Sequence, residues 1–315
     1  MSRIVVGFDG SEPGRDALAL ARGLAGTKGA ELVVGVALPY EPVPIIEVEG
    51  YDRALAEHFE QLFGQVEREL PGLPFARREL RASSPAHALS ELAETEGADL
   101  IVLGSTHRGK LGRIYPGSVA ERLLNGAPCA VAIAPRGFAD RDHLGPATIG
   151  VAYDGTAESK LALAEAQRLS EQLDASLCLI TVVPYPETIS KQLGHTAPEL
   201  AAAARELLGT TAYSEALHRH FRYVLDSAVA KLGAPGEVKA VLDEGDPAAA
   251  LAARGVELDL LVIGSRSYGP VRRVLLGGVS AEVMRTAPCP VIVVPRTASA
   301  TVPTLRPSFP EHSQA

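Results

Sequence analysis

The sequence lacks the features of cross-linked and membrane-spanning proteins. Its 315 residues include only three cysteines, Cys129, Cys178 and Cys289, which are widely spaced and form no CxxC pair. This spacing favours neither a disulfide framework nor a zinc site, and a reducing cytoplasm is the simplest setting. No apolar run reaches transmembrane length, and the apolar N-terminal run is too short for a signal peptide. We therefore expect a cytoplasmic protein.

Positive charge is also scarce. The formal net charge is −8, which argues against a general nucleic-acid binder, because such a protein carries a basic stripe. A small anionic ligand stays compatible with this balance, since one pocket can oppose the overall sign. Apolar residues make up 46% of the chain, enough for a real core, and the length suits about two domains.

Motifs for catalytic turnover are missing. The sequence has no GxxxxGK[ST] loop, no HxGH motif and no SGGxDS-type loop, although "GFDGSE" occupies the turn where the last would lie. Cysteines and histidines show no nucleophile–base pattern. His218 and His220 lie two apart on a helical run, so they point to different sides, form a poor metal pair and are expected on the surface. We predict no catalytic residues and no metal site.

The sequence contains an internal duplication of one unit. "IVVGFDGSEPGRDALALARGLA" near the start corresponds to "TIGVAYDGTAESKLALAEAQRLS" from residue 148, with Asp9 and Asp154 145 positions apart. "DLIVLGSTHRGKLGRIYPGS" from residue 99 corresponds to "DLLVIGSRSYGPVRRVLLGG" from residue 259, 160 positions apart. The second copy is thus 15 residues longer between these anchors. We predict domains at 1–137 and 147–296, a linker at 138–146, and a flexible Pro-containing tail at 297–315.

Strands and helices alternate within each copy. In the first copy the pattern predicts strands at 3–8, 31–37, 75–81, 99–103 and 129–134, with helices near 12–26, 51–70, 84–97 and 118–125. Four strands are continuous apolar runs, as buried parallel strands are, whereas 75–81 is more polar and suits an edge. Five strands with crossover helices predict an α/β fold, a doubly wound parallel sheet in each copy. Ligands of such sheets bind beyond the carboxyl ends of the strands.

The segment "GSTHRGKLGRIYPGS" (104–118) follows one such end. Its glycines allow close approach of a ligand, Gly117 and Ser118 open a helix, and Ser118 with Glu121 forms an S-x-x-E capping box. Arg108, Lys110 and Arg113 add positive charge. Phosphate binding is one interpretation, and a simple turn with a capped helix is the other. Asp9 and Asp154 also allow two interpretations, contact with a ribose or capping of the following helix.

These motifs are similar to those of the tandem type of the universal stress protein family, over nearly all of residues 1–296. The family pattern is G-x2-G-x9-G-[ST] after the fourth strand, with an Asp after the first. The resemblance implies a Rossmann-like, adenine nucleotide alpha hydrolase-like fold with two five-stranded sheets of order 3-2-1-4-5, dimeric through the last strand. Several family members bind ATP, and others bind no nucleotide.

The resemblance also implies site residues. Asp9 and Asp154 would lie at the ribose, the backbone near Val36 and Val182 at the adenine, and the two glycine-containing loops at the phosphates. The full set of implied nucleotide-binding residues is Gly7, Asp9, Val36, Leu103, Gly104, His107, Arg108, Gly109, Gly117, Ser118, Val119, Ala152, Asp154, Val182, Ile263, Gly264, Arg266, Ser267, Gly269, Gly277, Gly278 and Val279.

Both copies depart from the family pattern in the same way. His107 and Ser267 stand where the middle glycine is expected, with Gly109 and Gly269 two residues later. The second copy alone also lacks the final hydroxyl residue, because Gly278 stands where the first copy has Ser118. If the middle position needs a positive φ, a non-glycine residue costs about 1 kcal/mol there. His107 is either a ligand contact or a solvated loop residue.

Together these observations predict an ATP-binding regulatory protein of the stress response. The nucleotide, with or without Mg²⁺, would alter conformation or partner affinity rather than be turned over rapidly. The two domains would pair through "CAVAIAP" and "CPVIVVP" as a pseudo-dimer, because an open apolar edge strand is a pairing hazard. Two chains could dimerise further, and the protein partner is unknown. The alternatives are a nucleotide-independent interaction module and a slow ATPase.

Overall fold

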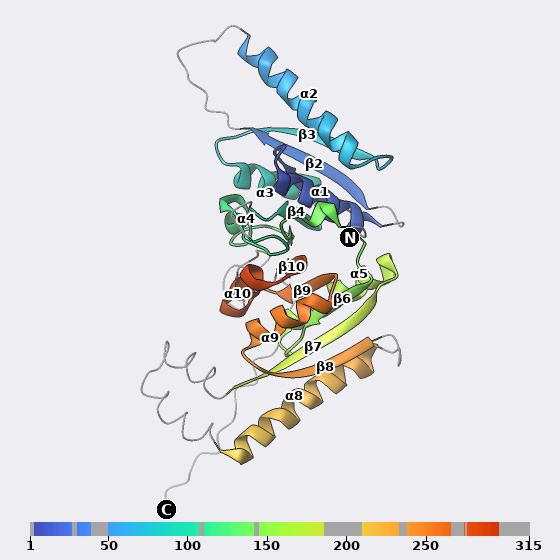
Figure 1. Cartoon of the computed structure of the whole chain (residues 1–315), viewed down its shortest axis with the longest axis vertical. Coiled ribbons are helices and arrows are strands. Elements are labelled where there is room, and N and C mark those ends of the chain that lie inside the picture. The colour runs from blue at the N-terminus through green and yellow to red at the C-terminus, as the bar shows by residue number, and fades with distance from the viewer. Residues whose placement is uncertain are drawn as a thin grey trace, which may run out of the picture.

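The structure is a computed structural model that describes residues 3–26, 30–38, 50–106, 110–141, 145–185, 210–232, 238–265, 274 and 276–295. The predicted tail at 297–315 lies outside these residues. So does most of the extra length of the second copy, apart from helix α8. Figure 1 shows the two copies as two stacked halves, with the first copy above and the second below.

Each copy alternates strands and helices as its pattern predicts. The first copy contains β1 (Arg3–Phe8), α1 (Glu12–Ala25), β2 (Glu31–Leu38), α2 (Tyr51–Glu69), β3 (Phe75–Arg81), α3 (Pro85–Glu96), β4 (Leu100–Gly104), α4 (Ser118–Leu123) and β5 (Ala130–Ala134). The short 3₁₀ helix η1 (Phe138–Asp140) follows.

The second copy repeats the first. It contains β6 (Thr148–Ala152), α5 (Ala157–Leu173), β7 (Ser176–Pro184), α8 (Thr211–Leu232), β8 (Val238–Gly245), α9 (Pro247–Arg254), the 3₁₀ helix η2 (Gly255–Glu257), β9 (Leu260–Gly264), α10 (Gly278–Thr286) and β10 (Val291–Val294). In the described residues no helix is both long and apolar enough to cross a membrane.

All ten strands form one sheet of order β3-β2-β1-β4-β5-β10-β9-β6-β7-β8. Each half therefore has the expected order 3-2-1-4-5, and within each half neighbouring strands run parallel. The halves join where β5 and β10 pair antiparallel, with Ile292 opposite Ala132. The expected pairing of the two last strands is thus present.

Helices cover both faces of the sheet, so the central strands are buried on both sides. Ile4 and Val6 face a core cluster that includes Phe59 of α2, whereas Val5 faces a second cluster that includes Leu89 of α3. This explains why the central strands read as unbroken apolar runs. The strand at 75–81 is an edge strand, as its polarity predicts, and β8 takes the other edge.

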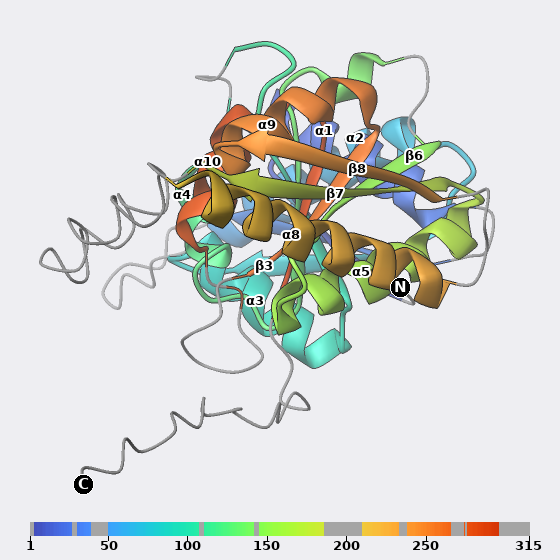
Figure 2. The same cartoon turned by 90° about the horizontal axis from the view of Figure 1, so that it is seen from below.

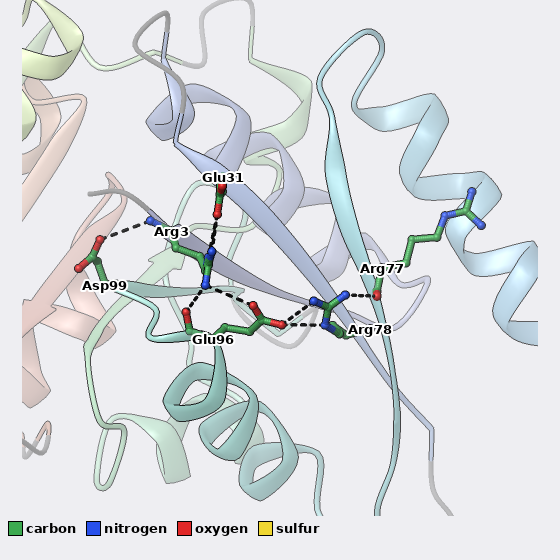
Figure 3. Close-up of polar contacts among 6 residues, drawn as sticks. All are labelled: Arg3, Glu31, Arg77, Arg78, Glu96 and Asp99. Atoms are coloured by element: carbon green, nitrogen blue, oxygen red, sulfur yellow. Dashed lines mark hydrogen bonds and ion pairs between the residues drawn. The ribbon is translucent and has the colours of Figure 1, made fainter.

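A polar network fastens the amino-terminal ends of the first-copy strands (Figure 3). The Arg3 guanidinium at the start of β1 donates to Glu31 Oε2 at 2.6 Å, and the Arg3 amide donates to Asp99 before β4. Arg78 of β3 donates to Glu96 Oε1 at 2.7 Å. The Glu31 carboxylate raises the pKa of Arg3 by accepting this hydrogen bond. The network lies at the edge of the sheet opposite the carboxyl ends, where ligands bind in such folds.

A buried aspartate holds the start of the predicted linker. Asp16 of α1 is 3% exposed, and its carboxylate accepts from the Gly137 and Ala139 amides, both at 2.8 Å. Burial raises the pKa of Asp16 against the opposing effect of these amides. Phe138 between them is also buried. The chain after β5 is therefore fixed to α1, which the polar sequence of the segment does not reveal.

Replacing Asp16 by Ala should lower the free energy of unfolding by about 2 kcal/mol, because two amides lose a buried acceptor. The measurement is urea denaturation followed by circular dichroism. Asp52→Ala is the matched control, since its carboxylate is 84% exposed beside Arg81, and a change within about 0.5 kcal/mol is expected there. Equal effects of the two variants would contradict the anchoring role of Asp16.

Helix α8 covers the outer strands of the second copy, as Figure 2 shows. The side chain of His218 is 33% exposed and that of His220 is exposed, so both helix histidines lie at the surface as expected. His218 Nδ1–H donates to Ser214 O at 3.0 Å, and Nε2 lies 2.6 Å from Glu244 Oε1 on β8. The carbonyl of Ser214 and the Glu244 carboxylate raise the pKa of His218.

Because the pKa of His218 is raised in the folded state, its stabilising contribution is full below the unfolded value of about 6.5. It is lost as pH rises through the folded-state pKa. We expect the melting temperature of the chain to fall over that range by more than that of His218→Gln. His87→Gln is the control, because His87 pairs with Glu91 in an exposed position. Parallel curves for the chain and His218→Gln would contradict the role of this pair.

Candidate functional site

The candidate site lies at the carboxyl ends of β1 and β4. These strands are neighbours, with Val6 opposite Val102, although two strands and three helices separate them in the sequence. Successive connections from β1 go outward to β2 and β3 and then return to the other side of β1. The gap between β1 and β4 is therefore the switch point where ligands of doubly wound sheets bind. β6 and β9 form the same junction in the second copy, with Val151 opposite Val262.

A rigid turn places Asp9 at this junction. Gly10 has φ of +79°, and Asp9 Oδ1 accepts hydrogen bonds from the Ser11 amide, at 3.0 Å, and from the Ser11 hydroxyl. Ser11 Oγ in turn accepts from the Gly14 amide at 3.3 Å and caps α1. The cap is therefore Ser11, and Asp9 supports it without being the cap itself. The Asp9 side chain is exposed at the end of β1.

The second copy builds the same turn. Gly155 has φ of +81°, and Asp154 Oδ1 accepts from the Thr156 amide at 3.0 Å and from its hydroxyl at 2.6 Å. Thr156 Oγ1 accepts from the Ser159 amide and caps α5. Within the described parts of the chain, Oδ2 of neither aspartate accepts a hydrogen bond, and both side chains are exposed. Each carboxylate is thus held by one oxygen and open at the other.

Gly104 brings the start of α1 close to the end of β4. A Cβ added to Gly104 would lie 1.8 Å from the carbonyl oxygen of Pro13, so no other residue fits without moving the helix. A Cβ on Gly264 would lie 2.8 Å from the oxygen of Glu158 in the same place of the second copy. The missing side chain of Gly104 leaves room for the helix that carries the Asp9 turn. That the Gly104 backbone also approaches a ligand stays a prediction.

Hydrogen bonds join the start of the loop after β4 to Tyr115 near its end. Ser105 is fully buried, and its Oγ accepts from the Tyr115 amide at 2.6 Å. The Thr106 amide donates to the Tyr115 carbonyl at 2.9 Å. In the second copy Ser265 is also buried, at 6% exposure, but its hydroxyl has no hydrogen-bond partner in the described part of the chain. The glycine pattern did not single out these buried serines.

The capping box predicted for Ser118 and Glu121 is wrong. Gly117 is the N-cap of α4, with extended φ and ψ of −85° and 176°, and its carbonyl accepts the first helical bond from the Glu121 amide. Ser118 is instead the first helical residue, and it is exposed at the helix start. In the second copy Gly277 is the cap and Gly278 is exposed in the corresponding place.

The cations expected near the phosphates divide into two groups. Lys110 and Arg113 line a groove between the two copies, and Arg113 Nη1 donates to the Thr286 carbonyl of the second copy. His107, Arg108, Gly109, Arg266, Ser267 and Gly269 lie outside the described residues, so their roles stay predictions. No cluster of three or more His, Cys, Asp or Glu side chains suited to a metal occurs among the residues described.

Strand register corrects one pairing of positions. Val36 lies opposite Phe8, and the residue that corresponds to Phe8 in the second copy is Tyr153. Ala152 lies opposite Ile180, so the next residue, Tyr153, lies opposite Thr181. The buried hydroxyl of Thr181 donates to the Tyr153 carbonyl at 2.7 Å. The counterpart of Val36 is therefore Thr181, and Val182 lies one residue further along β7.

The remaining implied residues are largely packing residues. Leu103 and Ile263 belong to the core beneath α3 and α9, with 6% and 3% exposure. A Cβ on Gly7 would meet the Leu103 side chain at 2.7 Å, which explains the glycine. Ala152, Val119 and Val279 are partly buried against the same core. Leu103 and Ile263 are therefore expected to meet a ligand through their backbone groups.

Comparison with known proteins identifies the family of both copies. The sequence model of the universal stress protein family matches residues 1–135 and again 147–295. The chain belongs to the universal stress protein family. A universal stress protein of Mycobacterium tuberculosis is 28% identical over 306 residues, which cover 93% of this chain and 99% of that protein. One from Thermus aquaticus is 36% identical over 132 residues, covering 41% of this chain and 94% of its own length.

Solved structures of universal stress proteins share the fold of the whole chain. The crystal structure of one from Archaeoglobus fulgidus has a TM-score of 0.62 and covers 94% of this chain and 98% of that chain, at 20% sequence identity. A universal stress protein structure from Pseudomonas aeruginosa has a TM-score of 0.61, at 17% identity and 94% coverage of each chain. At these identities the likeness concerns the tandem α/β fold.

The close contact at Gly104 gives a test of the site's architecture. Gly104→Ala should lower the free energy of unfolding by about 3 kcal/mol, because the added methyl group overlaps the Pro13 carbonyl. Gly278→Ala is the matched control, since a Cβ there meets nothing within 4 Å, and we expect a change within about 0.5 kcal/mol. Urea denaturation measures both. A Gly104→Ala protein as stable as the control would show that α1 does not need this contact.

Proposed function

We propose that each copy binds an adenine nucleotide at the carboxyl ends of its first and fourth strands. The observation that carries the proposal is the anchored aspartate at the switch point. Asp9 and Asp154 each have one oxygen fixed by the turn and the other open, and the family resemblance implies a ribose contact for an aspartate after the first strand. The exposed ends at Ser118 and Gly278 flank the same junction and would face the phosphates.

The bound nucleotide would act as a signal rather than a substrate. Neither the sequence motifs nor the described side chains supply a nucleophile paired with a base, so we propose regulation of conformation or partner binding in the stress response, in the cytoplasm. ATP is the nucleotide we favour, with Mg²⁺ as a companion of the triphosphate. Further dimerisation of the chain belongs to this proposal. The altered glycine positions at His107 and Ser267 favour the rival, a nucleotide-independent interaction protein.

Isothermal titration of nucleotide-free, full-length protein with ATP tests the proposal. Asp9→Ala and Asp154→Ala should each weaken one site about 10–100-fold, because a hydrogen bond to a charged group contributes about 1.5–3 kcal/mol. Ser11→Ala is the control for the turn, since it removes the cap of α1 and the hydroxyl contact to Asp9 but keeps the carboxylate and its hydrogen bond from the backbone amide of residue 11. It should lower stability and leave ATP affinity within about threefold.

Three other results would change this conclusion. Absence of ATP binding to the nucleotide-free protein would favour the interaction module. Equal weakening by Ser11→Ala and Asp9→Ala would remove the ribose contact from the proposal. Sustained phosphate release that disappears in Asp9→Ala and Gly117→Ala would identify a slow ATPase instead of a sensor.

A further inference from the structure

A groove lies between the two copies and shares the loop before α4 with the first candidate nucleotide site. One wall is the loop before α4, and the other is formed by the end of α9, by η2 and by the end of α10. The groove has a volume of about 570 Å³, within the range of about 300–1,000 Å³ typical of ligand pockets. Its lining residues are Lys110, Arg113, Ile114, Tyr115, Ala252, Ala253, Val256, Arg285 and Thr286.

The groove is strongly positive in an acidic protein. Lys110 and Arg113 come from the first copy and Arg285 from the second, and none of the described lining residues carries a carboxylate. None of these three cations forms a salt bridge with an acidic residue in the described ranges. Arg113 donates to the Thr286 carbonyl, a neutral acceptor, and so keeps its charge available. Three uncompensated cations in a concave surface focus a positive potential, although the whole chain carries −8.

The same groove exposes apolar surface. Tyr115 is 51% exposed and Val256 is 74% exposed, two of the few large apolar side chains that face solvent in the described structure. Ala252 and Ala253 also line the groove. Tyrosine and arginine are enriched in protein interfaces, and clustered exposed apolar residues mark interaction sites. An inorganic anion bound in the groove would not cover the apolar side chains of Tyr115 and Val256, which would stay exposed to solvent.

We propose that this groove binds an acidic segment of a partner protein, with carboxylates at Lys110, Arg113 and Arg285 and an apolar side chain between Tyr115 and Val256. Charge complementarity selects the occupant. A second copy presenting the same surface would place cations against cations, which costs free energy in a symmetric contact. The proposal supplies a partner surface and does not require that nucleotide binds.

The test is a selection of displayed peptides on the full-length protein, free of nucleotide, followed by fluorescence anisotropy with the selected peptides. We expect peptides rich in Asp and Glu with an apolar residue, bound more weakly as NaCl is raised from 0.05 to 0.5 M. Arg285→Glu and Lys110→Glu should each weaken binding at least tenfold. Lys160→Glu, at an exposed lysine of α5, is the matched control and should leave binding unchanged.

Two further variants separate charge from packing. Val256→Ser should weaken binding severalfold without altering the salt dependence. A selected peptide with Lys in place of its acidic residues should bind the Lys110→Glu/Arg285→Glu double variant better than the original chain. Selected peptides without acidic enrichment, or binding insensitive to Arg285→Glu, would overturn the proposal. A dimer of the chain that Arg285→Glu dissociates in sedimentation equilibrium would also overturn it, because a second copy would then be the occupant.

Discussion

The antiparallel contact between β5 and β10 is the constraint on which the architecture depends. Both strands are wholly apolar and nearly fully buried, so each would be an open hydrophobic edge if its half stood alone. Pairing them leaves only the polar strands β3 and β8 at the edges of the sheet. Because every strand of a half runs parallel to its last strand, the two halves run in opposite directions. The strand ends near Asp9 and Asp154 therefore lie on opposite sides of the shared sheet, measured along the strand direction.

This arrangement separates the two candidate nucleotide sites and brings Arg113 of the first copy and Val274 of the second to the contact between the halves. The segment from Ser105 to Tyr115 begins at one site and ends against the other half, where Arg113 meets Thr286. Val274 of the second copy likewise donates from its amide to the Ala127 carbonyl of the first. A change of loop conformation at one site would therefore alter the contacts between the halves. Such a shared element is what coupling between two sites requires.

Much of the fold was predictable because the repeat and the strand pattern are local properties. The five strands of the first copy were placed within one or two residues, and the polarity of 75–81 identified an edge. The roles of individual site residues were less accessible. Gly104 is explained by the Pro13 carbonyl, Asp16 by the amides of Gly137 and Ala139, and Thr181 by the register of β7 against β6. Each explanation involves a residue brought close only by the fold.

By itself, the sequence determined the duplication, the α/β class and the position of the aspartate turns and glycine loops relative to their strands. These follow from periodicity, spacing and turn chemistry, which act over a few residues. The tertiary structure decided which residue caps each helix, which glycine is required by packing, and that Arg113 and Lys110 line a groove between the copies. Those outcomes depend on distances across the sheet and across the β5–β10 contact, because close packing and charge act through space and not along the chain.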